Sequence, residues 1–199
     1  MKRLIFFVFT GSVLIGCIGG VSSPTQFYSL DSDYYIKGLT EQKPANRISI
    51  GLGPISLPDS LNRPQIVTRE YKYKINIAEF NRWAGDLKDN MKKLLLGNLM
   101  QGLQTNQVSQ YPWPNHATPD YQLRIDILDF VGFLGEKVEF KGTWTLISSD
   151  RNKDVQIYSF SFTEKLANDS YETLVASMSK LVVLLAQQIV GVIKAEEKK

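Results

Sequence analysis

The chain has 199 residues, 43% of them hydrophobic, with 23 lysines and arginines against 20 aspartates and glutamates. This length predicts one domain with a substantial apolar core and is short for two. The near-balance of charge gives no polybasic surface, so no nucleic-acid partner is expected. A single cysteine excludes an intramolecular disulfide and a metal site built from several thiolates.

The first sixteen residues have the organisation of a bacterial lipoprotein signal peptide. Lys2 and Arg3 precede an apolar run over residues 4–15, which suits a signal-peptide core and is short of the roughly 20 residues of a spanning helix. The run ends in Leu14–Cys17, where a small glycine precedes the thiol that lipoprotein maturation acylates. The sequence therefore predicts cleavage after residue 16 and lipidation of Cys17. An uncleaved leader with a buried cysteine and a plain secreted protein are the alternatives.

Acyl chains such as palmitate on Cys17 would hold the mature protein at a membrane, because one chain binds reversibly and two bind stably. Ile18 follows, and since an aspartate in this place commonly marks retention in the inner membrane, it favours the outer membrane. Residues 17–25 form a tether rich in glycine and serine, with a reach of about 15 Å. We expect one periplasm-facing domain over residues 26–194 and a charged tail over residues 195–199.

Residues 31–47 are polar and without a stable period, and two β-strands are expected after them. Apolar residues alternate with polar or small ones in Ile48–Leu52 and again in Tyr71–Ile77, which predicts strands with one solvent-exposed face. Their connection, residues 57–69, carries two prolines, two arginines and several apolar residues. That composition suits a rigid binding edge. A stiff connection with solvated arginines is the simpler interpretation, and composition alone favours it.

The first predicted helix begins at Phe80 and ends near Leu103. Its apolar residues recur mostly at steps of three or four positions, while charged residues fill much of the other face. These apolar residues are Phe80, Trp83, Leu87, Met91, Leu94, Leu95, Leu99 and Leu103. Asn76 and Glu79 have the spacing of a capping box before this helix, and Gly102 or Asn106 is expected to end it.

Three more strands follow this helix. Alternation of apolar and polar residues predicts them over Tyr121–Ile127, Val138–Trp144 and Tyr158–Phe162. The polar segment 148–154 predicts a turn that joins the last two as an antiparallel hairpin.

The second predicted helix spans Tyr171–Ile193, where apolar residues recur at three-and-four spacing. Asp169 and Glu172 are expected to cap it, and Lys194–Lys199 is expected to fray. Strands and helices therefore alternate in groups along the chain. This order predicts an α+β fold in which two long amphipathic helices pack on one face of a mainly antiparallel or mixed sheet.

Residues for common catalytic chemistry are sparse. The one histidine, His116, lies in a proline-containing loop and is expected to be solvated rather than catalytic. The sequence holds no Gly-x-Ser-x-Gly elbow, and Gly51–Pro54 lacks the lysine and third glycine of a phosphate-binding loop. We expect no enzymatic activity, no cofactor and no metal. Tyr111, Trp113 and Trp144 leave open a small-molecule or peptide-binding lipoprotein, although aromatics at strand spacing are more often core.

Four segments of the sequence carry a family resemblance. They are residues 55–69, Tyr28–Leu30, Glu79–Ala84 and Val108–Trp113. The first contains Leu57-Pro58 and then Arg-Pro-Gln-Ile-Val-Thr-Arg over residues 63–69. In this combination the chain resembles the PqiC/YmbA family of auxiliary lipoproteins of ABC-type transport systems. It departs from the family pattern at Gly85-Asp86, where glutamate and proline are usual, and at Ser60 and Asn62, which replace an aromatic residue and an aspartate.

The resemblance implies a partner of a transporter rather than a transporter. In such systems an inner-membrane protein with MCE domains spans the periplasm and meets the lipoprotein at the outer membrane, in lipid movement between the membranes. The family also assembles into rings, so a homo-oligomer is expected. The resemblance implies a partner or subunit contact through Pro58, Leu61, Arg63, Pro64, Gln65, Arg69, Arg82 and Trp83. The arginines would bind carboxylates across an interface or brace the loop internally, and Trp83 would be a buried anchor between helix and sheet.

Overall fold

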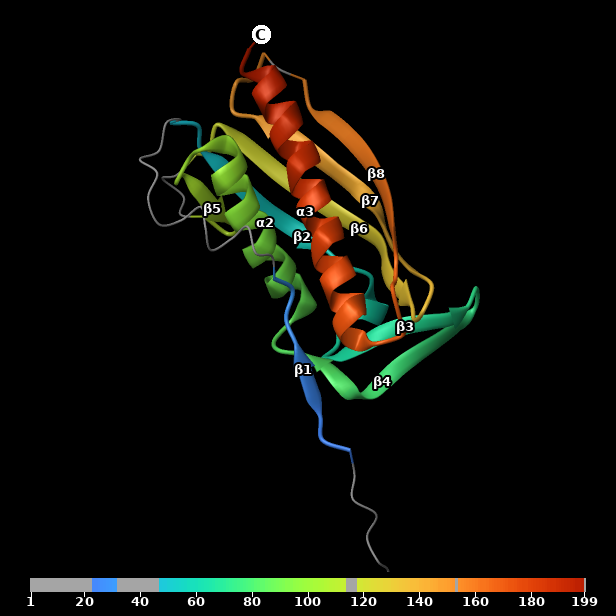
Figure 1. The fold of residues 1–199 in the computed structure, drawn as a ribbon. Helices are drawn as coiled ribbons and strands as arrows, with labels where there is room; N and C mark the ends of the chain where they lie inside the picture. Colours follow the sequence, from blue (N-terminus) through green and yellow to red (C-terminus); the bar gives the residue numbers. More distant parts are fainter. Residues whose placement is uncertain (1–22, 32–46, 114–117, 153, 199) are drawn as a thin grey trace, which may run out of the picture.

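The structure is a computed structural model that describes residues 23–31, 47–113, 118–152 and 154–198 (Figure 1). The predicted leader, Cys17, His116 and most of the polar segment 31–47 lie outside the described residues. Within the described residues, eight strands form one mixed sheet. The strands are β1 (Gln26–Tyr28), β2 (Ile50–Ser56), β3 (Gln65–Tyr71), β4 (Lys74–Trp83), β5 (Val108–Gln110), β6 (Tyr121–Phe133), β7 (Lys137–Ser148) and β8 (Gln156–Lys165).

Strand β6 is the centre of the sheet. One of its edges pairs antiparallel with β7, and β7 pairs antiparallel with β8, which confirms the predicted hairpin. The other edge is shared: β2 lies parallel to the first half of β6, and β3 joins its far end, where Thr68 is opposite Gly132. Beyond β3 come β4, antiparallel, and β1, parallel to β4, while the short β5 lies parallel to β2. The predicted mixed sheet is therefore confirmed.

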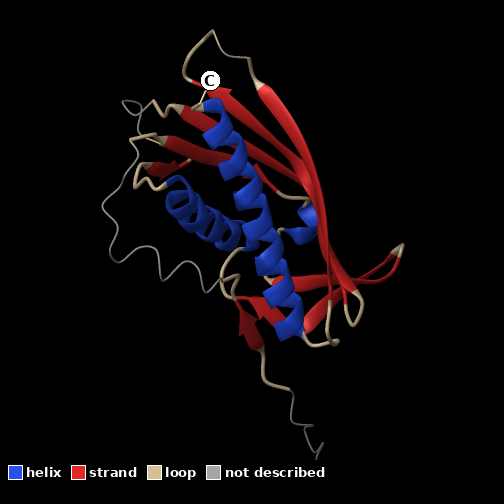
Figure 2. Cartoon of the chain, turned by 45° about the horizontal axis from the view of Figure 1, so that its top comes forward, coloured by secondary structure: helices blue, strands red, loops and turns tan. Residues whose placement is uncertain are grey.

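Helices α2 (Leu87–Leu103) and α3 (Tyr171–Glu196) lie on one face of this sheet, as predicted (Figures 1 and 2). A short 3-10 helix, η1 (Asp59–Leu61), lies between β2 and β3. The alternating residues of β7 that are fully buried, such as Phe140 and Trp144, belong to the same core as the apolar stripes of α2 and α3.

Helix α3 is long and apolar enough to pass as a membrane span by length and composition alone. Packing in the protein core accounts for these apolar residues, because Leu174, Leu181 and Ile189 are completely buried. Two glycines allow the close packing that buries them. Gly132 on β6 lies directly under Leu174, and a Cβ added at Gly102 on α2 would lie 2.6 Å from Val190 of α3.

The predicted start of the first helix is wrong. Residues 76–83 belong to β4, and α2 begins at Leu87 after Asp86 as N-cap. Gly85 separates the two elements with a φ of +97°, a left-handed conformation that glycine adopts without strain. Asn76 and Glu79 therefore form no capping box, and Asn76 instead donates a side-chain hydrogen bond to Thr68 of β3.

Other predicted boundaries also shift. Helix α2 ends at Leu103, near the predicted end, but its C-cap is Gln104, which has a left-handed φ of 54°, rather than Gly102 or Asn106. Ser170, not Asp169, caps α3, because its Oγ accepts a hydrogen bond from the Thr173 N–H at 3.2 Å. The helix continues to Glu196 instead of fraying from residue 194, and the Glu196 side chain is buried.

The predicted strand Tyr71–Ile77 is a hairpin end. Tyr71 closes β3, residues 72–73 form the turn, and Lys74 opens β4. The alternating apolar residues of this segment are not turned into the core. Tyr73 is 88% exposed and Ile75 is 50% exposed.

Candidate interaction surface

Three of the four family-like segments meet at one end of the sheet, which we call the β1–β4–β3 end. Tyr28–Leu30 begins at the last residue of β1, and Glu79–Ala84 contains the end of β4. Residues 63–69 contain the start of β3 and the two residues before it. The backbones are joined across these strands, because the Trp83 N–H donates to the Pro64 carbonyl at 2.7 Å and the Ala84 N–H donates to the Tyr28 carbonyl at 2.7 Å. The fourth segment, Val108–Trp113, lies at the other edge, beside β2.

The loop before β3 is a compact structure. Pro58 precedes η1, and its carbonyl accepts a hydrogen bond from the Leu61 N–H at 2.9 Å. Leu61 is 6% exposed and Trp83 is 4% exposed, so both belong to the core. Trp83 is thus a buried anchor, as expected. Leu61 and Trp83 can support an interaction surface from beneath, while Pro64 and Gln65 are accessible on it.

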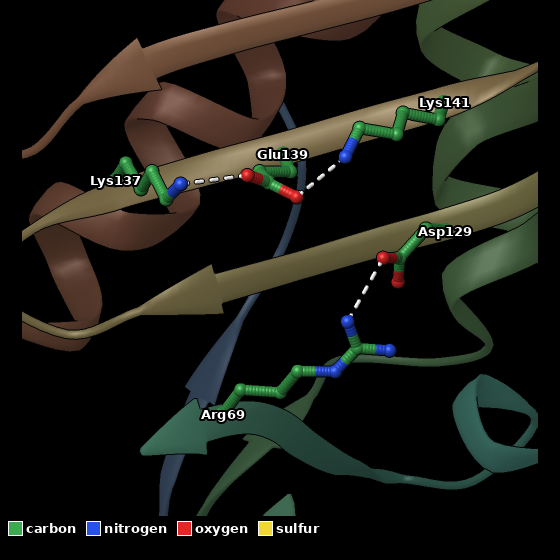
Figure 3. Close-up of polar contacts among 5 residues, drawn as sticks. All are labelled: Arg69, Asp129, Lys137, Glu139 and Lys141. Carbon is green, nitrogen blue, oxygen red and sulfur yellow. Dashed lines mark hydrogen bonds and ion pairs between the residues drawn. The ribbon is translucent and has the colours of Figure 1, made fainter. Parts of the chain in front are cut away.

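The three arginines of this end have different surroundings. Arg69 on β3 donates from Nη1 to Asp129 Oδ2 of β6 at 3.0 Å, so it braces the sheet internally (Figure 3). Arg63 and Arg82 are half-buried, and the Nε atom of each is buried without a hydrogen-bond partner among the described residues. Arg82 lies opposite Gln65 in the β3–β4 ladder, beside Pro64. The two paired segments of this end therefore each carry an arginine whose Nε atom is buried and unpartnered among the described residues.

Asn90 was not among the predicted site residues, yet its side chain fixes this end to α2. Its Oδ1 accepts hydrogen bonds from Ser29 Oγ at 2.6 Å and from the Leu30 N–H at 3.2 Å. Its Nδ2 donates to the Asp86 carbonyl at 2.9 Å, and the residue is 6% exposed. A sequence signal existed, because an asparagine stands on the buried stripe of the helix, three positions after Leu87.

The first turn of α3 also meets this end. The rings of Tyr28 and Tyr171 lie 6.3 Å apart between centroids. Burial raises the pKa of the Tyr171 hydroxyl above its ordinary value, so this residue is neutral here throughout the physiological range.

Charged side chains are ordered on the β7 strand as well. Glu139 accepts from Lys137 and from Lys141, each at 2.7 Å (Figure 3). These hydrogen bonds, Lys137 first, lower the pKa of the Glu139 carboxyl to about 2. Together with Arg69 and Asp129 they form a set of fixed ion pairs, and among the described residues no three acidic, histidine or cysteine side chains gather as a metal site would need.

A cavity of about 420 Å³ lies at the other edge of the sheet. Tyr111 and Trp113 line it with ring centroids 5.3 Å apart in an edge-on arrangement, and Gln122 and Ile147 complete its wall. Trp144 does not reach it. This third candidate pocket residue is completely buried in the core, stacked on Tyr158 at 4.3 Å, so its assignment to a pocket is wrong.

Comparison with known proteins agrees with this fold. A family described as "ABC-type transport auxiliary lipoprotein component" matches residues 28–190. An uncharacterized protein of known crystal structure is 19% identical, with a TM-score of 0.68 over 86% of this chain and 99% of its own. Protein XCC0632 from Xanthomonas campestris is 14% identical, with a TM-score of 0.64 over 78% of this chain and 91% of its own. No curated protein matches the chain.

These findings define an envelope transport accessory protein. The chain belongs to the family of ABC-type transport auxiliary lipoprotein components, as the matched region spans nearly the whole of the folded domain. The two similar structures establish the shared fold. A more distant likeness, to the PelC dodecamer from Paraburkholderia phytofirmans, has a TM-score of 0.41 at 14% identity over 74% of this chain and 93% of its own, and carries no inference about assembly.

Proposed function

We propose that this protein is the outer-membrane-anchored lipoprotein subunit of an MCE/ABC-type intermembrane lipid transport system and acts by binding its periplasm-spanning partner. Family membership supports the transport role, and the leader sequence with Cys17 and Ile18 supports the anchor and its membrane. The observation that carries the proposal is the pairing of two family-like segments at one end of the sheet, where Gln65, two residues after Arg63, lies opposite Arg82.

The chemistry of this end suits contact with carboxylates. Arg63 and Arg82 are only half-buried, so a carboxylate from a partner could pair with the accessible part of each guanidinium group. Pro58 and Pro64 restrict the loop that carries Arg63 and reduce the entropy lost on binding. The protein's activity in this account is contact, with no reaction catalysed and no cofactor bound.

The β1–β4–β3 end could contact either of two partners, a neighbouring copy of this chain in a ring or the MCE-domain protein. We propose a homo-oligomeric ring with its acyl chains in one membrane. Its subunits would present the arginine pair at repeated positions, which multiplies a weak single contact.

Paired arginine variants test this function. Arg63→Ala/Arg82→Ala is expected to lower co-purification of the MCE-domain partner, or the mass of the oligomer, by at least about tenfold, since two charge-assisted contacts are lost. Arg124→Ala removes an exposed arginine from β6 and is the matched control. Unchanged mass and co-purification in a folded double variant would return Arg63 and Arg82 to the role of solvated surface residues.

The cavity at Tyr111 and Trp113 favours a second candidate function, a small-molecule or peptide-binding envelope lipoprotein. Its volume of about 420 Å³ lies in the range of small-ligand sites. Native mass spectrometry of the purified mature protein separates the two. A ring without a ligand supports the transport accessory, whereas a monomer with a bound ligand supports the binding lipoprotein.

A further inference from the structure

The hairpin formed by β3 and β4 ends in a group of exposed apolar side chains. Tyr71 is 67%, Tyr73 88%, Ile75 50% and Ile77 46% exposed. Register places Ile75 opposite Arg69 and Ile77 opposite Val67, so the two isoleucines share one face of the hairpin. Four large exposed apolar residues thus lie within seven positions of one hairpin, a grouping of the kind found at interaction sites, unlike single exposed apolar residues.

The hairpin projects from the body of the molecule, at the opposite end from the C-terminus of α3 (Figures 1 and 2). Basic residues alternate with its apolar ones. Lys72 Nζ lies 5.3 Å from the centroid of the Tyr73 ring, and Lys74 pairs with Glu70 at 2.5 Å. Tyrosines with a polar hydroxyl, isoleucines and long lysines in one short segment are the composition of a membrane–water interface.

The topology places the predicted anchor within reach of the hairpin. Because β1 runs parallel to β4, with Gln26 opposite Asn81 and Tyr28 opposite Trp83, the chain before β1 extends toward the beginning of β4. Lys74 lies seven strand residues before Asn81, or about 24 Å away. The nine residues from Cys17 to β1 can span up to about 30 Å. A bilayer that holds Cys17 is therefore within reach of the hairpin.

We propose that the β3–β4 hairpin is a second membrane contact, in which Tyr71, Tyr73, Ile75 and Ile77 enter the interfacial layer of the phospholipid bilayer that holds Cys17. Lys72 then meets lipid phosphates. This inference rests on the anchor of the proposed function. Acyl chains alone attach the protein but leave the domain free to rotate on its tether, whereas a second contact fixes which side of the domain faces the periplasm.

A vesicle-binding experiment separates this contact from the acyl anchor. The leader-free chain, residues 17–199 with Cys17→Ser, is mixed with vesicles of one part phosphatidylglycerol to three parts phosphatidylethanolamine and sedimented. Binding at low salt is expected, and Tyr73→Ser/Ile75→Ser should weaken it at least about tenfold. Lys72→Gln should weaken it only on vesicles that contain phosphatidylglycerol.

The matched control is Val155→Ser/Ile157→Ser, which removes two apolar residues of similar exposure, 58% and 71%, around the start of β8. It should bind vesicles as the parent does. All four changed residues are largely exposed, so the unfolding midpoint should be unaltered in both variants. Equal binding by the parent and the hairpin variant, or no binding by either, would overturn the proposal.

Sedimentation velocity on the same samples tests the alternative that the hairpin binds a second copy of the chain. A hairpin variant that loses oligomer mass but keeps vesicle binding makes the hairpin a subunit interface and overturns the membrane contact. The assay contains no transport partner, so its failure leaves the proposed function standing. Unchanged partner co-purification and oligomer mass in the folded Arg63→Ala/Arg82→Ala variant, with vesicle binding intact, would overturn the proposed partner contact and leave the membrane contact standing.

Discussion

Two segments of this protein have nearly the same sequence pattern and opposite environments. Tyr121, Leu123, Ile125 and Ile127 alternate along β6, and Tyr71, Tyr73, Ile75 and Ile77 alternate along the hairpin. The β6 residues are at most 4% exposed, whereas the hairpin residues are at least 46% exposed. Both patterns predict extended chain, but burial depends on what covers the strand. Strand β6 lies centrally beneath the helices, and the hairpin extends past them (Figure 1).

The largest expected effect compares one isoleucine from each segment. Ile125→Ala should lower the free energy of unfolding by about 3 kcal/mol, because it leaves a cavity in a fully packed core. Ile75→Ala should lower it by less than about 0.5 kcal/mol. Urea unfolding measures both. Similar losses for the two variants would show that the hairpin is covered in the isolated protein.

A second variant tests the junction between helix α2 and the β1–β4–β3 end. Asn90→Ala should cost about 2 kcal/mol, since it leaves the Leu30 N–H and the Asp86 carbonyl without their side-chain partner. Asn98→Ala is the control, because Asn98 donates only to the Leu94 carbonyl of its own helix. Hydrogen exchange should show faster exchange in β1 for the Asn90 variant alone.

A smaller loss of stability is expected from a change at the N-terminus of α3. Ser170→Ala should lower stability by about 1 kcal/mol, because the Thr173 N–H loses its acceptor. Ser170→Asp should restore most of this loss, as aspartate also caps helices. Thermal unfolding of the two variants checks the prediction, and equal midpoints for alanine and aspartate would contradict it.

The smallest effect concerns Glu139 on β7, and it depends on pH. Its folded-state pKa of about 2 lies below the ordinary value of 4.5, so the charged form stabilises the fold above that value, and the contribution is lost as pH falls toward 2. Because Lys137 and Lys141 are partly exposed, Glu139→Gln should cost about 1 kcal/mol or less at pH 7. The difference between variant and parent should shrink between pH 4.5 and pH 2 in urea unfolding. A constant difference would show that the ion pairs do not form in solution.

Local pattern was sufficient for the long elements of this fold. The period of three and four over Tyr171–Ile193 predicted the first residue of α3 and placed its end three residues too early, because more than six helical turns leave little ambiguity. At the first helix, Phe80, Trp83 and Leu87 fit a helix by spacing alone. The information that separates β4 from α2 is the glycine at position 85, whose left-handed backbone no helix interior accommodates.

The candidate site depended on contacts that no local pattern contains. Arg69 and Asp129 are 60 residues apart in sequence, and so are Leu30 and Asn90. Composition therefore identified residues 57–69 as unusual but could not assign which arginine is internally paired. Only the placement of β3 beside β6 gives Arg69 its bracing partner, Asp129, and separates it from Arg63 and Arg82 with their unpaired Nε atoms.

Site-specific photo-cross-linking in intact cells tests most directly whether this protein works by contact through its β1–β4–β3 end. A cross-linking amino acid at Gln65 is compared with one at Ile157, an exposed position on β8. The account predicts adducts from position 65 with the MCE-domain protein or with a second copy, and few from position 157. Adducts from position 157 alone, in a protein that is acylated at Cys17 and folded, would contradict it.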